Sequence, residues 1–197
     1  MKVTYIRDSR SKGYIRVGVA DGEEKYDFTV SDSQYLSLGS LLCGDTVESI
    51  EELKSYDMRY RAKLYALRIL SYGDNSKAGL KRKLMARSIP FDVAEDICEE
   101  MIGLGYLDED TQLRSLIENE ANFKLLGRRR IFPKLISKGY KKERIELVLE
   151  DLISHGIVDF DKNKQKLIDK KLTRGASALE KRKLLYNYGY SVDDFFS

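Results

Sequence analysis

The stretch KRKLMARSIPFDVAEDICEEMIGLGYLDED, residues 81–110, is matched 51 positions later by FPKLISKGYKKERIELVLEDLISHGIVDFD, residues 132–161. Apolar positions at helical spacing, acidic helix starts and glycine helix ends recur in the same order. A fixed period of this length indicates stacked structural repeats. The aligned pairs include Leu84/Leu135, Asp92/Glu143, Ile97/Val148, Gly105/Gly156 and Asp108/Asp159.

A third copy begins near the end of the chain, at a shift of 50 residues. RKLLYNYGYSVDD, residues 182–194, aligns with FPKLISKGYKKER, residues 132–144, so that the Gly-Tyr pair at 189–190 falls on the Gly-Tyr pair at 139–140. The sequence stops at Ser197, one turn into what should be the third helix of this copy. We therefore expect the third repeat to be incomplete.

The residues before the repeats have a different pattern. Residues 2–30 alternate polar and apolar side chains around turn signals at 9–13 and 21–22, which predicts a small antiparallel sheet. A short helix should follow, entered at Ser31 or Asp32 and closed by Gly39. Residues 41–53 suggest one more short strand and the start of a linking helix.

The expected fold is therefore mainly α. Tandem three-helix repeats should form an elongated, curved array, preceded by a small β-rich N-terminal module. The expected divisions are the β-rich module with its linker at 1–55, repeat 1 at 56–110, repeat 2 at 111–162 and the incomplete repeat 3 at 163–197.

Charge distribution and cysteine content indicate which kinds of partner and which cellular compartment to expect. The first 110 residues hold 16 Lys/Arg and 20 Asp/Glu, whereas the remaining 87 hold 19 and 12. This asymmetry points to nucleic acid or an acidic partner surface, with a solvated helical surface as the alternative. The two cysteines, Cys43 and Cys98, form no disulfide framework, and no signal peptide or membrane span is evident, so a cytoplasmic location is expected.

The sequence contains no convincing catalytic constellation. The single histidine, His155, occupies a repeat position held elsewhere by Leu104 and reads as a helix-end residue. No phosphate-binding glycine loop is present. The acidic cluster at 108–110 repeats at 159–161, which favours helix N-caps over a metal site. We expect no enzyme activity, no cofactor and no metal.

Basic residues are the more informative feature, because they recur on or beside the middle helix of each repeat. A recurring basic strip on stacked repeats could follow a phosphate backbone. No aromatic stacking platform is expected among these charges, so base-specific reading is not predicted. The predicted contact residues are Lys81, Arg82, Lys83, Arg87, Arg128, Arg129, Arg130, Lys134, Lys138, Lys181, Arg182 and Lys183.

Three of these cations, Arg128, Arg129 and Arg130, stand where a helix should begin. Positive charge at a helix N-terminus opposes the helix dipole, so local stability does not explain the three arginines well. This favours a binding role for them.

Several motifs together resemble the RecX family, bacterial regulators of the RecA recombinase. They are the S-x-x-x-L-x-x-K-L pattern of Ser76, Leu80, Lys83 and Leu84, then GYLDED at 105–110, GRRRI at 127–131 and KLISKGY at 134–140. The resemblance covers roughly residues 57–195. Departures from the family pattern occur at Gly79, Gln112 and Leu125, where acidic, aromatic and basic residues respectively are common.

The resemblance implies three tandem three-helix repeats and a role in recombination, DNA repair and the SOS response. It also implies a monomer that binds the RecA–DNA filament and inhibits ATP hydrolysis and strand exchange by RecA. The monomer should contact DNA only weakly, through the phosphate backbone of the DNA. The alternative is a stand-alone helical-repeat protein that binds DNA or RNA without a recombinase partner.

Overall fold

The computed structural model describes residues 1–73 and 75–191. These residues form two compact units. The N-terminal unit comprises residues 1–72 and 83–103, and the C-terminal unit comprises the described residues of 73–82 and 104–191. The predicted divisions after residues 55, 110 and 162 remain a prediction, and the start of a third helix in repeat 3, expected after residue 191, lies outside the described residues.

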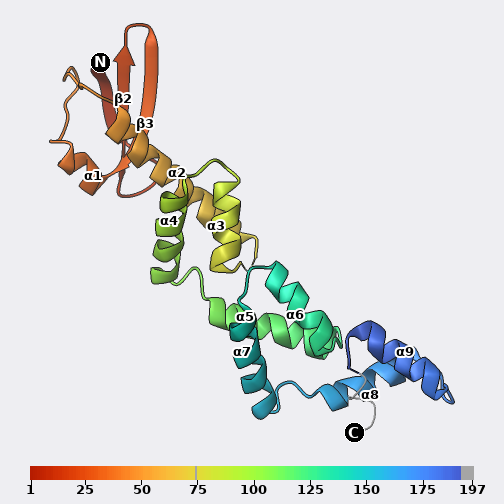
Figure 1. Cartoon of the computed structure of the whole chain (residues 1–197). Helices are drawn as coiled ribbons and strands as arrows, with labels where there is room; N and C mark the ends of the chain where they lie inside the picture. The colour runs from red at the N-terminus through yellow and green to blue at the C-terminus, as the bar shows by residue number, and fades with distance from the viewer. Residues whose placement is uncertain (74, 192–197) are drawn as a thin grey trace. The chain divides into compact units, whose positions relative to one another are not determined.

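The N-terminal unit begins with the predicted antiparallel sheet, β1 (Lys2–Asp8), β2 (Tyr14–Asp21) and β3 (Glu24–Ser31), in the order β1-β2-β3. α2 (Glu51–Ser71) packs against the sheet (Figure 1). Alternate strand residues and the start of α2 together bury one core, because one face of each strand is apolar. This core contains Val3, Val17, Val19, Phe28, Val30, Ile50 and Leu53.

The short helix after the sheet is present as α1 (Asp32–Ser37). Ser31 caps it with a capping box, accepting a hydrogen bond from the Gln34 N–H while the Gln34 side chain accepts one from the Ser31 N–H. The prediction of a strand within residues 41–53 is wrong, because that segment forms only an isolated bridge between Thr46 and Lys2. Backbone hydrogen bonds from residues 44–47 still cover the outer edge of β1.

The remaining helices follow in the predicted order, and the expectation of a mainly α fold with an N-terminal sheet is confirmed. Asp92 lies in the first turn of α4, so the acidic helix start expected from the repeat is present. The helices are α3 (Lys77–Met85), α4 (Phe91–Gly103), α5 (Glu109–Glu118), a π-helical turn η1 (Asn119–Phe123), α6 (Arg128–Ser137), α7 (Lys142–Ser154), α8 (Phe160–Lys171) and α9 (Ala178–Tyr188).

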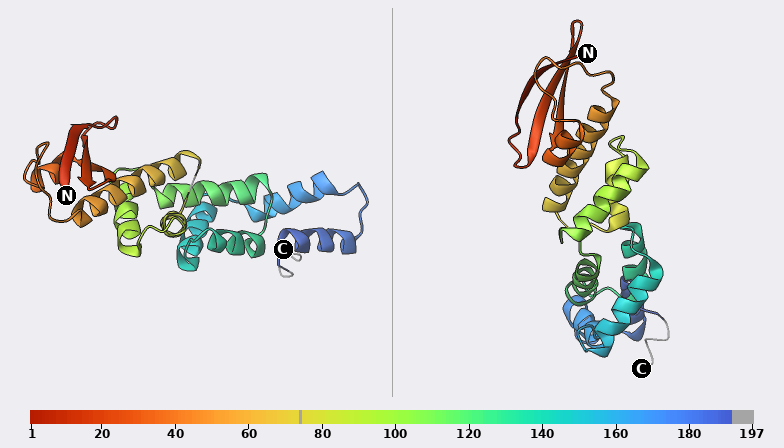
Figure 2. Two further views of the ribbon diagram at one scale, coloured as in Figure 1. Left: turned by 90° about the horizontal axis from the view of Figure 1, so that it is seen from above. Right: turned by 90° about the vertical axis from the view of Figure 1, so that its left-hand side faces the viewer.

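Two apolar clusters hold the C-terminal unit together. One fills the space between α5, α6 and α7 and includes Leu113, Ile131, Leu135 and Leu149. The other lies where α8 and α9 run side by side (Figure 2), and it includes Leu185 and Tyr190, among others. Leu84, Leu135, Ile97 and Val148, the apolar residues that the 51-residue shift pairs, are all buried.

Leu135→Ala should lower the free energy of unfolding by about 2–5 kcal/mol, because the Leu135 side chain has no exposed surface and its loss would leave a cavity. Urea unfolding followed by circular dichroism would measure the change. The neighbouring Ile136 is 47% exposed, so Ile136→Ala should change stability by no more than about 0.5 kcal/mol. Equal effects of the two substitutions would contradict the assigned core.

Candidate functional site

The predicted basic residues lie at the starts, outer faces and ends of the middle helices. Arg82 and Lys83 are exposed on α3, while Lys81 on the same helix is half-buried; Arg87 is exposed just after it. The exposed residues Lys181, Arg182 and Lys183 lie on α9. The remaining predicted residues lie on α6 or at its end: Arg128, Arg129, Arg130, Lys134 and Lys138.

The start of α6 is hydrogen-bonded to the end of α9. Gly127, the N-cap of α6, donates its N–H to the carbonyl of Tyr188 at 2.8 Å, and Arg129 donates its N–H to the carbonyl of Gly189 at 3.1 Å. The first N–H groups of a helix and its last carbonyls have no partners within their own helix. This contact, the α6–α9 joint, therefore pairs free donors of one helix with free acceptors of the other.

Two glycines make the joint possible. A Cβ on Gly127 would lie 2.6 Å from the carbonyl carbon of Gly189 and 2.7 Å from the Tyr190 nitrogen. A Cβ on Gly189 would lie 2.5 Å from Arg130 Cγ and 2.7 Å from the Arg130 nitrogen, and Gly189 also has a left-handed φ of 90°. The backbones approach so closely that neither position has room for a side chain.

The same joint occurs one repeat earlier, between α3 and the end of α6. Ser76 donates its hydroxyl to the carbonyl of Lys138 at 2.7 Å and accepts the Gly79 N–H at 2.9 Å, so it caps α3. A Cβ on Gly139, with a φ of 100°, would lie 2.8 Å from Ser76 Oγ. Because the 51-residue shift carries Ser76 onto Gly127, the repeat preserves the joint as well as the core.

Local partners hold two of the three arginines at the start of α6. Arg128 Nη1 lies 3.0 Å from Glu150 Oε1, and its guanidinium lies 5.8 Å from the ring centroid of Phe160. The guanidinium of Arg129 lies 5.3 Å from the ring centroid of Tyr186. Ion pairs and cation–π contacts of this kind offset the unfavourable dipole term, so the dipole argument for a binding role is weaker than the sequence suggested.

The expectation that no aromatic stacking platform for bases accompanies the basic residues stays a prediction. Aromatic rings do contact three of the cations: the guanidinium groups of Arg87, Arg128 and Arg129 each lie over a ring from a distant part of the sequence. These contacts could not be predicted from the sequence, because each arginine and its aromatic partner are 22 to 57 residues apart. Tyr186 is 56% exposed, so the Arg129–Tyr186 pair presents both a cation and a ring face to solvent.

Lys134 has a structural role that its sequence position did not reveal. Its Nζ lies 2.5 Å from Glu120 Oε2, and Lys124 Nζ lies 2.7 Å from Glu120 Oε1. The Glu120 carboxylate, in the π-helical turn η1, is only 3% exposed, so it requires charged partners. Burial works to raise the pKa of Glu120, but the hydrogen bonds from Lys124 and Lys134 outweigh burial and hold that pKa below its ordinary value.

This carboxylate predicts a pH-dependent stability. Because the pKa of Glu120 is lower in the folded chain than in the unfolded chain, its contribution is complete well above about pH 4.3 and is lost as the pH falls through the folded pKa. Glu120→Gln should therefore cost about 1–3 kcal/mol at pH 7. The stability difference from wild type should shrink toward zero below about pH 4. Urea unfolding of both proteins from pH 7 to pH 3 would measure it, and a difference independent of pH would contradict the ion-pair role.

The candidate catalytic and metal-binding residues have structural positions. Asp108 and Asp159 are the N-caps of α5 and α8, which confirms the predicted helix-cap role. Hydrogen bonds from the Thr111 side chain and backbone hold the pKa of Asp108 below its ordinary value. His155 is the exposed C-cap of α7. Among the described residues, no group of three or more His, Cys, Asp or Glu side chains could hold a metal ion.

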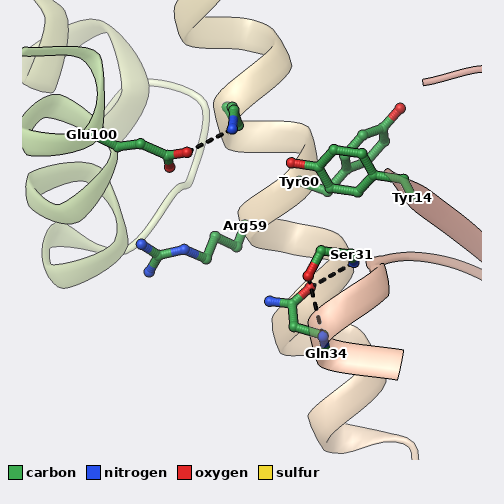
Figure 3. A pocket seen from close by; sticks show the side chains of 7 residues that line it. Tyr14, Ser31, Gln34, Arg59, Tyr60 and Glu100 are labelled. Atoms are coloured by element: carbon green, nitrogen blue, oxygen red, sulfur yellow. Dashed lines mark hydrogen bonds and ion pairs between the residues drawn. The ribbon is translucent and has the colours of Figure 1, made fainter. Parts of the chain in front are cut away.

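A small polar hollow of about 250 Å³ lies in the N-terminal unit, between the sheet, α2 and α4 (Figure 3). Its two cations already have acidic partners: Lys63 Nζ lies 2.6 Å from Glu100 Oε1, and Arg59 Nη1 lies 2.8 Å from Asp96 Oδ2. The Glu100 hydrogen bond raises the pKa of Lys63. These contacts tie α2 to α4, so the hollow is better explained as part of the packing than as a ligand site.

No helix within residues 1–73 and 75–191 combines the length and the apolar composition that crossing a membrane requires. Neither cysteine in these residues forms a disulfide; Cys43 is exposed and Cys98 is buried.

Comparison with known proteins relates the sequence and the fold to one family. No protein-family model matches the chain. Regulatory protein RecX of Caldanaerobacter subterraneus subsp. tengcongensis is 25% identical over 182 residues, which is 88% of this chain and 86% of that protein. Regulatory protein RecX of Listeria innocua serovar 6a is 25% identical over 176 residues, which is 87% of this chain and 65% of that protein.

Solved structures agree in fold. A crystal structure of regulatory protein RecX superposes with a TM-score of 0.70 over 98% of this chain and 96% of that chain, at 19% identity. In sequence and in fold, the chain is thus similar to RecX regulatory proteins. RecX from Lactobacillus salivarius superposes with a TM-score of 0.57 over 71% of this chain and 92% of that chain, at 21% identity.

This similarity confirms the RecX resemblance seen in the motifs and the fold class that it implied. The chain spans about two thirds of the length of the Listeria innocua RecX protein, so that relative is longer. The RecX relatives that match the chain are named regulatory proteins. The glycines of the two joints and the Glu120 cluster were missed as sites by sequence reasoning, although the recurring Gly-Tyr pairs were a visible signal of the joints.

Proposed function

We propose that this chain is a non-enzymatic regulator that binds the RecA–DNA filament and inhibits ATP hydrolysis and strand exchange by RecA. The observation that carries the proposal is the match to RecX regulatory proteins along 88% of the chain. A filament of DNA and protein is a cytoplasmic target in bacteria, and a monomeric regulator can add to it one copy at a time.

The basic residues of the middle helices support contact with an anionic polymer. Arg82, Lys83 and Lys138 are exposed, as are Lys181, Arg182 and Lys183 on α9. Lysine and arginine side chains contact phosphates without reading the base sequence, so DNA binding should be weak and directed to the backbone. Lys134 contributes less to such a surface, because its ammonium group neutralises the buried Glu120 carboxylate.

The second candidate function is a stand-alone nucleic-acid-binding protein, favoured by the same basic residues. A titration separates the two. RecA hydrolyses ATP on single-stranded DNA, and the rate would be followed while this chain is added at amounts too low to coat the DNA. The proposed function requires the rate to fall in that range. A rate that falls only once the DNA is coated, with equal DNA binding in the absence of RecA, would favour the stand-alone protein.

A further inference from the structure

A groove in the N-terminal unit lies between α2 and the segment that follows α3. Its volume is about 480 Å³. The floor is apolar: Phe28 and Ala62 are buried, while Met58 and Ile89 are partly buried beside them. Apolar side chains that line an open groove lose contact with water when a partner's side chain covers them, which favours binding of a segment that carries an apolar group.

One arginine on the wall of the groove, Arg87, is positioned by Tyr65 so that it can bind an anion. Arg87 donates its Nε–H to the Tyr65 hydroxyl at 2.9 Å, and its guanidinium lies 4.9 Å from the centroid of the Tyr65 ring. These contacts fix the plane of the guanidinium and use one of its five N–H donors. No acidic side chain among the described residues lies within ion-pair distance of Arg87, so its two terminal nitrogens remain available.

The other charged residues of the groove differ from Arg87. Arg61 Nε lies 2.6 Å from the buried Asp57 carboxylate, which also accepts the Thr29 N–H of the edge strand β3 at 2.9 Å. Lys54 Nζ lies 2.7 Å from Glu51 Oε1. Asp57 is thus neutralised within the fold, and Arg87 supplies the uncompensated positive charge of the groove.

The repeat gives a second reason to treat this place as a docking position. Ser88 has a left-handed φ of 61°, and the 51-residue shift carries residues 88–89 onto 139–140. In the C-terminal unit, Gly139 is covered by the start of α3, and Gly189 is covered by the start of α6. In repeat 1 the corresponding residues, Ser88 and Ile89, line the open groove instead.

We infer that this groove binds an acidic segment of a partner protein that also carries an apolar side chain. A carboxylate of the segment accepts two hydrogen bonds from the terminal nitrogens of Arg87, whose planar fork matches carboxylate geometry. The apolar side chain covers Phe28, Met58 and Ile89. The apolar floor favours a protein segment over a nucleic-acid backbone, because phosphates and sugars would leave that floor without a suitable partner.

The inference concerns a protein-binding site and is testable without RecA. The probe is a fluorescently labelled peptide of alternating Asp and Leu residues, and binding to the full chain is followed by fluorescence anisotropy. Arg87→Ala should weaken binding about tenfold or more, and Arg87→Lys should restore it only in part, because lysine keeps the charge and lacks the fork. Met58→Asp should weaken binding by placing a carboxylate in the floor.

The matched control is Arg68→Ala, which removes an exposed α2 arginine that does not line the groove. It should bind the peptide as wild type does. A peptide with Asn in place of Asp should bind wild type as weakly as the acidic peptide binds Arg87→Ala. Absence of peptide binding to wild type, or equal binding by wild type and Arg87→Ala, would overturn the inference.

Nucleic acid is tested in the same assay with a labelled oligothymidylate. If Arg87→Ala weakens binding of the oligonucleotide and leaves binding of the peptide unchanged, the groove is a nucleic-acid site and the inference is wrong. This inference and the proposed function can fail independently. The chain could bind the peptide without affecting ATP hydrolysis by RecA, and it could inhibit RecA without binding the peptide.

Discussion

Gly189→Ala should lower the free energy of unfolding by about 3 kcal/mol, which corresponds to a fall in Tm of roughly 6–12 °C. Two costs combine. An alanine at a φ of 90° is strained, and its Cβ would lie 2.7 Å from the backbone nitrogen of Arg130, which cannot rotate away. The substitution should therefore open the α6–α9 joint and expose the carbonyls that α6 now satisfies.

Two further alanine substitutions separate these costs. Gly156 also has a left-handed φ, 68°, but a Cβ there would meet nothing within 4 Å, so Gly156→Ala carries the strain alone and should cost about 1 kcal/mol. Gly127 has an ordinary φ of −81°, so Gly127→Ala carries only the steric clash with Gly189. Thermal unfolding by circular dichroism would rank the three, and an equal Tm for Gly156→Ala and Gly189→Ala would mean that the joint contributes nothing.

Changing Arg128, Arg129 and Arg130 together to Ala should weaken filament binding and reduce inhibition of RecA. The dependence of log affinity on log salt should also flatten, by about one unit for each phosphate that the variant no longer binds. The stability change should be small, about 1 kcal/mol, since the substitution removes a surface ion pair and two cation–π contacts. Affinity for RecA filaments would be measured across a series of salt concentrations.

A second triple variant controls for net charge. Lys162, Lys166 and Lys170 are exposed on α8 and lie outside the predicted strip, so their replacement by Ala removes the same three charges. This control should retain nearly wild-type affinity and salt dependence. If both triple variants lose affinity equally, only the overall charge matters, and if the arginine variant binds as wild type does, the start of α6 is not a contact surface.

The repeat was predictable because its signals are local. Apolar spacing, caps and glycines within a few residues of one another define each helix, and comparison at a shift of 51 residues then reveals the second copy. The capping roles of Ser31, Asp108 and Asp159 follow from the same short-range chemistry. The extra strand predicted near Thr46 failed because pairing, rather than local pattern, decides whether an extended segment becomes a strand.

The candidate contact surface was predictable only as a set of residue types. The sequence showed where cations recur, but it could not show which of them already have partners. Lys134 forms an ion pair with the buried Glu120, whereas Arg87 contacts the hydroxyl and ring of Tyr65 and has no acidic partner among the described residues. Such differences depend on contacts between residues 14 and 22 positions apart, respectively, which neither period nor spacing encodes.

By itself, the sequence determined the helical repeat, the β-rich start and the RecX resemblance, because hydrophobic period and helix caps act over a few residues. Only the tertiary structure decided how repeats join. The Gly127–Gly189 approach requires two backbones from distant parts of the chain to meet where a methyl group would not fit. The tertiary structure also decided which cations remain available to bind a partner, because a charge is neutralised only by groups that the fold places within a few ångströms of it.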